Sequence, residues 1–170
     1  GYAIASTVGL AIAVVVFLLA SGGGSDGSAE GDAHINLNAS IGSTNGVEPD
    51  NRAGTVPASA KVTNLAAAAK AAGCDLRLHL KDEGHNHIPV DSQAPEYKTN
   101  PPTSGNHVEP PYQQADGAYS EMPLPIDFVH SLEHGRMEIQ YSPELPENAQ
   151  LELKGLYETM YGGTLLFPNE

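Results

Sequence analysis

The chain has a single cysteine and few basic residues. Because Cys74 is the only cysteine among 170 residues, no disulfide can form within the chain. In an oxidising compartment, such a thiol is buried, bound to a ligand or paired with another molecule. Only 8 Lys and Arg stand against 21 Asp and Glu, which gives a net charge of -13. That charge opposes binding to nucleic acid or to anionic lipid surfaces, so we expect no nucleic-acid partner.

The chain also lacks familiar catalytic motifs. It has no Cys-x-x-Cys redox pair and no P-loop pattern ending in Gly-Lys-Ser or Gly-Lys-Thr. Ser104 and Ser131 each lie near a histidine in the sequence, but no orienting triad is evident. Both serines are better explained as turn and cap residues. The sequence therefore assigns no catalytic residue and leaves open whether the protein is an enzyme.

One long apolar run is present, at residues 2–20, and it contains no charged residue. At about 1.5 Å per helical residue it can just cross a hydrocarbon core of roughly 30 Å. We predict a transmembrane anchor at residues 1–20. A cleavable signal segment is the alternative, although the run is longer than a usual signal core.

The region after the run, residues 21–60, is rich in Gly, Ser, Asn, Asp and Ala and is predicted to be a flexible linker. It contains no Lys or Arg before Arg52, which favours the translocated side of a membrane. We therefore expect a single-pass protein of the cell membrane. Its main domain, residues 61–170, would lie outside the cytoplasm. The chain begins with Gly rather than Met and stops just after an apolar stretch, so we expect both ends to be truncated.

The apolar patterns of residues 61–170 predict an α+β fold. This fold would be a small mixed sheet with flanking helices and a long Pro/Gly-rich loop, preceded by the N-terminal transmembrane helix. Helices are expected at residues 61–73, 127–134 and 146–161, and strands at 75–80, 136–141 and 164–167, with coil over most of 89–125.

Local signals define the ends of these helices. Thr63 or Asn64 is expected to cap the first helix and Gly73 to end it. Asp127 is expected to cap the second helix, and Gly135 to end it. If the last two strands are parallel neighbours, the helix between them makes a right-handed crossover.

Two stretches carry most of the functional information, residues 97–107 and 129–135. In the first, a stiff Pro-Pro pair precedes His107, which restricts the loop that carries this imidazole. In the second, His130 and His134 are four residues apart and would share one face of a helix, with Glu133 close by. Clustered imidazoles and a carboxylate are typical ligands of zinc or copper. The predicted metal ligands are His107, His130, His134, His87 and Glu133.

Other donors and other readings stay open. His79 and His85 are weaker candidates for ligands. Sulfur from Cys74, Met122 or Met137 would favour copper, whereas an all-histidine site suits zinc as well. Histidines also cap helices and donate hydrogen bonds to backbone carbonyls. In that case the domain is a non-metal interaction module of the cell envelope that binds a partner protein.

A third reading follows from His-Ser-Leu-Glu-His at residues 130–134. It matches the H-x-x-E-H pattern of inverzincin metalloproteases, in which two histidines bind zinc and the glutamate is the general base. This reading makes the protein a zinc-dependent hydrolase. A lone pattern of five residues is common by chance, so the match is weak.

Several motifs together resemble a known family. They are Cys74 after Ala-Ala-Gly, His87-Ile-Pro, Tyr97 with Thr-Asn-Pro-Pro-Thr-Ser-Gly-Asn-His, Gly117-Ala-Tyr, Val129-His-Ser-Leu-Glu-His-Gly and Leu165-Leu-Phe-Pro. In order and spacing they resemble the bacterial and archaeal family called domain of unknown function 3105, over residues 70–170. The resemblance implies a membrane segment or signal followed by one extracytoplasmic domain. It implies no settled activity, and it implies a further strand and helix after the last motif.

Overall fold

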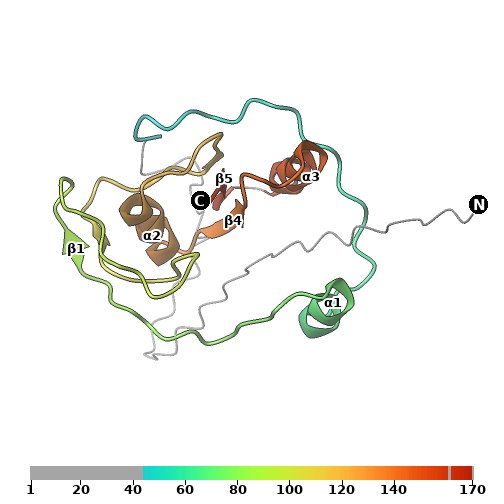
Figure 1. Cartoon of the computed structure of the whole chain (residues 1–170), viewed down its shortest axis with the longest axis horizontal. Coiled ribbons are helices and arrows are strands. Elements are labelled where there is room, and N and C mark those ends of the chain that lie inside the picture. The colour runs from blue at the N-terminus through green and yellow to red at the C-terminus, as the bar shows by residue number, and fades with distance from the viewer. Residues whose placement is uncertain (1–43, 161, 170) are drawn as a thin grey trace, which may run out of the picture.

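The computed structural model describes residues 44–160 and 162–169 (Figure 1). Their helices and strands follow in the order α1 (Leu65–Ala72), β1 (His87–Ile88), β2 (His107–Val108), β3 (Gly117–Ala118), α2 (Pro125–Glu133), β4 (Met137–Tyr141), α3 (Glu147–Glu158) and β5 (Thr164–Pro168). The predicted α+β class is confirmed. The predicted mixed sheet is wrong, because β3-β5-β4 and β1-β2 both pair in parallel.

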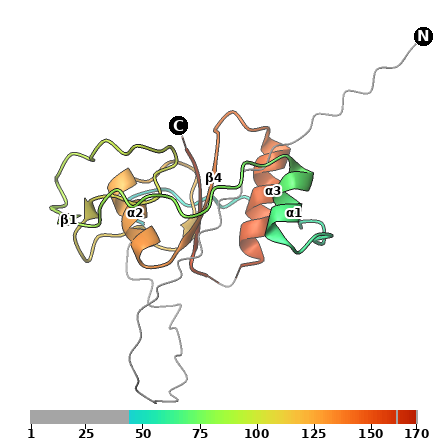
Figure 2. The same cartoon turned by 90° about the horizontal axis from the view of Figure 1, so that it is seen from below.

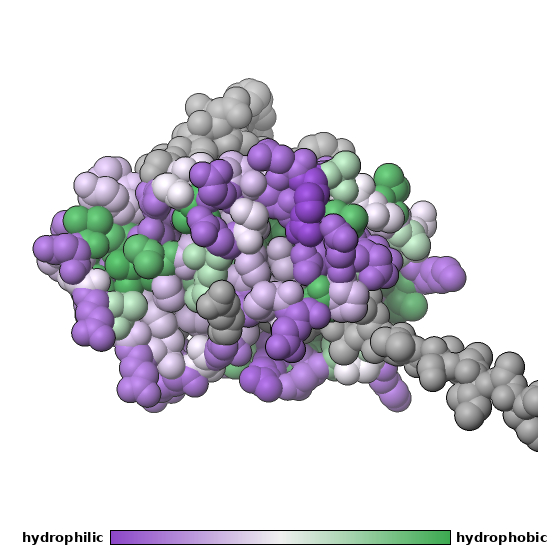
Figure 3. Space-filling model, turned by 45° about the horizontal axis from the view of Figure 1, so that its top comes forward, coloured by the Kyte–Doolittle hydropathy of each residue, from purple (hydrophilic) through white to green (hydrophobic). Residues whose placement is uncertain are grey.

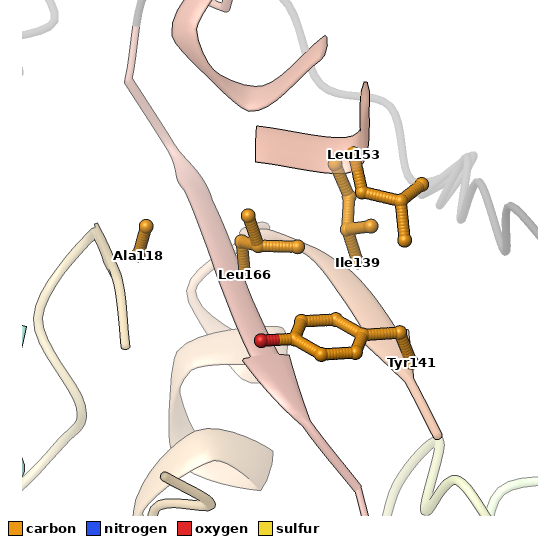
Figure 4. Close-up of a cluster of buried hydrophobic side chains, with 5 residues drawn as sticks. All are labelled: Ala118, Ile139, Tyr141, Leu153 and Leu166. Carbon is orange, nitrogen blue, oxygen red and sulfur yellow. The ribbon is translucent and has the colours of Figure 1, made fainter. Parts of the chain in front are cut away.

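The central strand β5 explains why the sheet is parallel and covered on both faces. Every residue of β5 is buried. Leu166 points toward α3 and joins one apolar cluster, which Figure 4 shows converging from three strands and α3. Phe167 points the other way, toward α2, and lies 5.0 Å from Phe128 between ring centroids. The two helices therefore cover opposite faces of the sheet (Figure 2), as parallel sheets require.

The predicted strand, helix and strand at the end of the chain are confirmed. β4 pairs with β5 from Met137 opposite Thr164 to Tyr141 opposite Pro168. Between the strands, α3 begins after Pro146, which has no N–H to satisfy. Ile139 and Tyr141 lie on the apolar face of β4, as their alternation predicts.

The start of α2 differs from the prediction. The helix begins at Pro125, with Leu124 as its N-cap residue, so Asp127 is not the cap. Proline suits the first helical position because its missing N–H would have no partner there. Asp127 is buried instead, and its Oδ2 accepts a hydrogen bond from Asn45 Nδ2 at 2.8 Å. Burial raises the pKa of Asp127, and the bond from Asn45 opposes this.

The region after α1 also differs from the prediction. α1 itself is confirmed: the Asn64 side chain caps it, and Gly73 ends it with φ +69°. The strand expected at residues 75–80 is wrong, because these residues form coil and, among residues 44–160 and 162–169, no strand pairs with them. Leu78 is 55% exposed. Alternating leucines alone do not make a strand without a partner.

Part of the predicted linker packs against the domain. Pro49 forms an antiparallel bridge with Tyr119, and Thr55 N–H donates to the carbonyl of Leu151 in α3 at 2.8 Å. The backbone of Thr55 lies so close to Gly155 that a Cβ there would collide with it. Residues 44–55 therefore run along the domain surface rather than away from it.

The surface is mainly hydrophilic on the face shown in Figure 3, with apolar side chains in small groups. Among residues 44–160 and 162–169, no helix has the length and apolar character needed to cross a membrane. The transmembrane helix predicted at residues 1–20 lies outside the described residues.

Candidate metal centre

Two short strands and one helix bring the candidate ligands together. His87 of β1 lies opposite His107 of β2 in parallel register, so both side chains can point to the same side of this ribbon. α2 packs against β2 and carries His130 and Glu133. β1 and α2 lie next to each other, on the side of the sheet away from α3 (Figure 2).

The four side chains meet closely. One ligand atom from each of His87, His107, His130 and Glu133 lies within 4.8 Å of the others. Glu133 Oε2 is 3.2 Å from His107 Nε2 and 3.4 Å from His87 Nε2. Ligand atoms of a tetrahedral zinc site lie roughly 3.3 Å apart, given metal bonds of about 2.0 to 2.1 Å. The cluster therefore has nearly the spacing of a metal-binding group.

Backbone carbonyls orient the two buried imidazoles. His107 Nδ1 lies 2.8 Å from the carbonyl of Gly105, and His130 Nδ1 lies 2.6 Å from the carbonyl of Tyr112. A carbonyl only accepts, so each Nδ1 carries the proton. In the neutral ring, each Nε2 then carries the lone pair that can bind an ion. Metal-binding histidines are typically held by this kind of hydrogen bond.

The charge states suit a cation. Burial lowers the pKa of His130, and the nearby His107, His134 and His87 add to this, against the bond to Tyr112. A lowered pKa favours the neutral imidazole, which is the form that binds metals. Burial also opposes ionisation of Glu133, but the nearby His107, His87 and His130 together outweigh it, and the pKa of Glu133 lies below its usual value.

The site has a buried side and an exposed side. His107 and His130 are each only 1% exposed. The side chains of His87 and Glu133 are 43% and 37% exposed. Two ligands are thus fixed in the protein interior, and two face solvent, from which an ion can enter.

The loop before His107 is held by aromatic packing. Gly105 has φ +139°, and a Cβ there would come within 2.6 Å of the Tyr97 ring. The Tyr97 hydroxyl donates to the carbonyl of Asn106 at 2.9 Å. The Gly-Asn-His sequence therefore lets the backbone approach Tyr97, which positions the Gly105 carbonyl for His107.

His134 does not belong to the group of four, although the sequence predicts it as a ligand. Its Nε2 lies 3.0 Å from His130 Nε2, and its side chain is exposed at the end of α2. Glu133 faces His107 and His87 instead of standing apart as a general base. The two histidines of the H-x-x-E-H pattern therefore lie close together, and the difference from that pattern lies in Glu133.

The other residues that the sequence offers as metal ligands lie outside the group of four. Cys74, His79 and His85 are not members of the cluster. Met122 packs against the apolar cluster around Phe128. The carbonyls of Gly105 and Tyr112 are the contributors that sequence reasoning missed, because every residue has a carbonyl and no sequence signal marks these two.

Residues 89–170 match a family model described as Protein of unknown function (DUF3105), so this part of the chain is similar to that family. The matched range contains His107, His130 and Glu133, and it begins two residues after His87. No curated protein and no solved structure matches the chain.

Proposed function

We propose that this domain binds a divalent transition metal ion, Zn²⁺ or Cu²⁺, through His87, His107, His130 and Glu133. One observation supports this most strongly. Both buried imidazoles donate from Nδ1 to a backbone carbonyl, and each offers one ligand atom to the same group as His87 and Glu133. A hydrogen bond from Nδ1 to a carbonyl would by itself fit a histidine with a structural role. Three converging imidazoles together with a carboxylate form a set of metal ligands.

The donor types narrow the choice of metal. The cluster offers nitrogen and carboxylate oxygen, and Cys74 is not part of it. Thiolate and thioether donors select Cu(I), whereas imidazole suits zinc and Cu(II). The proposed ion is therefore Zn²⁺ or Cu²⁺ rather than Cu(I).

The exposed half of the site supports reversible binding. His87 and Glu133 are accessible to solvent, so an ion can enter and leave without the core opening. We place this activity outside the cytoplasm, on a domain tethered by the apolar segment at residues 1–20. The role in this setting is metal handling, with the protein part of the cell envelope.

The direct test is the metal content of the purified full chain. Wild-type protein, Glu133→Gln and His130→Ala are dialysed against equal Zn²⁺ or Cu²⁺ and measured by elemental analysis. We expect about one ion per wild-type chain, and loss of at least roughly tenfold in affinity for each variant. Glu133→Gln is the key variant, because its half-exposed side chain can change without opening the core.

A matched control is His79→Asn. His79 is exposed, lies outside the cluster and has φ +55°, a conformation that asparagine adopts readily. This variant should retain the metal. A folded wild-type protein that binds neither ion would overturn the proposal and leave the non-metal envelope interaction module as the better reading.

A further inference from the structure

A pocket of about 420 Å³ adjoins the proposed metal centre and shares two residues with it, His107 and Glu133. We infer that this pocket binds a small organic carboxylate with an apolar body, whose carboxylate coordinates the metal. This inference rests on the proposed function, because the metal supplies the main attraction. The volume lies in the range typical of small-molecule sites, about 300 to 1,000 Å³.

The walls suit an apolar body. Leu80 comes from the coil after α1, and Val129 and Leu132 come from α2, so two separate segments enclose the pocket. Thr103 and Ser104 of the proline loop form the polar part of the wall. The Ser104 hydroxyl already accepts the N–H of Glu83 at 2.9 Å, so it holds the loop. Mostly apolar walls with a few placed polar groups are characteristic of small-molecule sites.

The charges favour an anionic head group. A divalent ion bound by three neutral imidazoles and one carboxylate retains one net positive charge. Lys81 adds a second positive charge to the pocket wall. Asp82 also lines the pocket and offsets the charge of Lys81; its Oδ1 accepts the N–H of Gly84 at 2.8 Å, and its Oδ2 lies 3.3 Å from His85 Nδ1. An anion is thus attracted at the metal end, although the chain as a whole is acidic.

Arg136 does not change this assignment. It lines the pocket, but its Nε donates to Asp116 at 3.1 Å and its Nη1 donates to the carbonyl of His134 at 3.0 Å. Its charge is therefore largely balanced within the protein. The metal remains the group that selects a carboxylate over an uncharged ligand of the same shape.

The experiment uses the full chain loaded with Co²⁺, whose visible absorption reports changes in its ligands. Benzoate is the probe, and benzyl alcohol, which has the same ring without the charge, is the matched control ligand. We expect saturable changes in the Co²⁺ spectrum with benzoate and none with benzyl alcohol. Failure of Co²⁺, Zn²⁺ and Cu²⁺ all to bind would overturn the proposed function. Binding of Co²⁺ without a benzoate response would overturn only the present inference.

A variant with a larger side chain in the pocket tests whether benzoate binds there. Leu80→Trp should weaken benzoate binding by about tenfold or more and leave Co²⁺ affinity within about twofold, because Leu80 touches the pocket but not the metal group. Leu78→Trp, two residues away and exposed, is the control and should behave as wild type. Thr103→Trp obstructs the pocket from the proline loop and replaces Leu80→Trp if that protein does not fold. An unchanged benzoate affinity in a folded, pocket-filled variant would show that the anion binds elsewhere.

Discussion

Around β5 nearly every side chain is buried and apolar, whereas residues 74–124 contain three strands of only two residues each. The first region is stabilised by packing on both faces of the sheet. The second is held mainly by polar contacts, such as Asn86 N–H to Asn106 Oδ1 and Lys98 N–H to Glu83 Oε2. A long coil of this kind needs such hydrogen bonds to keep one conformation. The comparison indicates that apolar burial is the main stabilising contribution in the sheet. A bound metal would therefore mostly order the loop.

The largest effect should come from a buried ring of the first region. Phe167→Ala removes a fully buried ring that packs between β5 and α2, and we expect a loss of about 3 to 5 kcal/mol in the free energy of unfolding. Denaturant unfolding measures it. Leu78→Ala is the control, since an exposed site should change stability by less than about 0.5 kcal/mol. Similar losses in the two variants would contradict this account of the core.

Metal addition should affect the two regions differently. At a free Zn²⁺ concentration of about 100 times its Kd, the folded state gains about 2.7 kcal/mol. Hydrogen exchange should show the main new protection near His87, His107 and His130, and little change in β4 and β5. A chelator should reverse the effect. Protection concentrated in the sheet instead would contradict the division between the regions.

A smaller loss of stability is expected when one hydrogen bond that holds the loop is removed. Tyr97→Phe removes the hydrogen bond to the Asn106 carbonyl while keeping the ring against Gly105, and should cost about 0.5 to 1.5 kcal/mol. Metal affinity should fall a few-fold, because the Gly105 carbonyl that orients His107 is held less firmly. Tyr112→Phe is the matched control, because Tyr112 is partly exposed and contacts His130 through its backbone carbonyl. Equal metal affinities in the two variants would argue against the role of Tyr97.

The smallest effect concerns a carboxyl in the sheet. Burial raises the pKa of Glu138 well above its usual value, although the hydrogen bond from Gln140 opposes this. The folded state therefore keeps a proton that the unfolded state releases above pH 4.5, so stability falls as pH rises beyond 4.5. Glu138→Gln removes this penalty. The variant should melt a few degrees above wild type at pH 7 and at nearly the same temperature at pH 4.

The melting temperatures should be compared by calorimetry across this pH range without added metal. Glu147→Gln is the control, since Glu147 is exposed at the start of α3. It should not reproduce the pH-dependent difference. A constant difference between Glu138→Gln and wild type at both pH values would assign the effect to packing rather than to ionisation.

The sequence predicted elements whose signals are local. Gly73 ends α1, Pro146 precedes α3, and the alternation of Met137, Ile139 and Tyr141 marks β4. The wrong predictions concern contacts between residues that are far apart in the sequence. The leucines at 76 and 78 alternate like a strand, but in the part of the chain that the structure describes no strand pairs with them.

In the candidate site too, local contacts were predictable from the sequence and distant ones were not. Proximity of His130 and Glu133 follows from helical spacing. The pairing of His87 with His107 depends on a parallel register between segments about twenty residues apart, which no local pattern specifies. Asp127 was expected at a cap because its residue type favours caps, but burial against Asn45 determines its place. Sequence thus predicted the residue types of the site better than their contacts.

The contact between Asn45 and Asp127 has a mechanical consequence. Thr44 and Asn45 lie within the predicted linker and are its first described residues, and they bond to Gln114 and Asp127 before the chain reaches β3 or α3. Tension applied from the N-terminal side would therefore load α2 first. Asp127 lies three residues before His130 on that helix, so a pulling force would reach the histidine cluster before it strained the sheet.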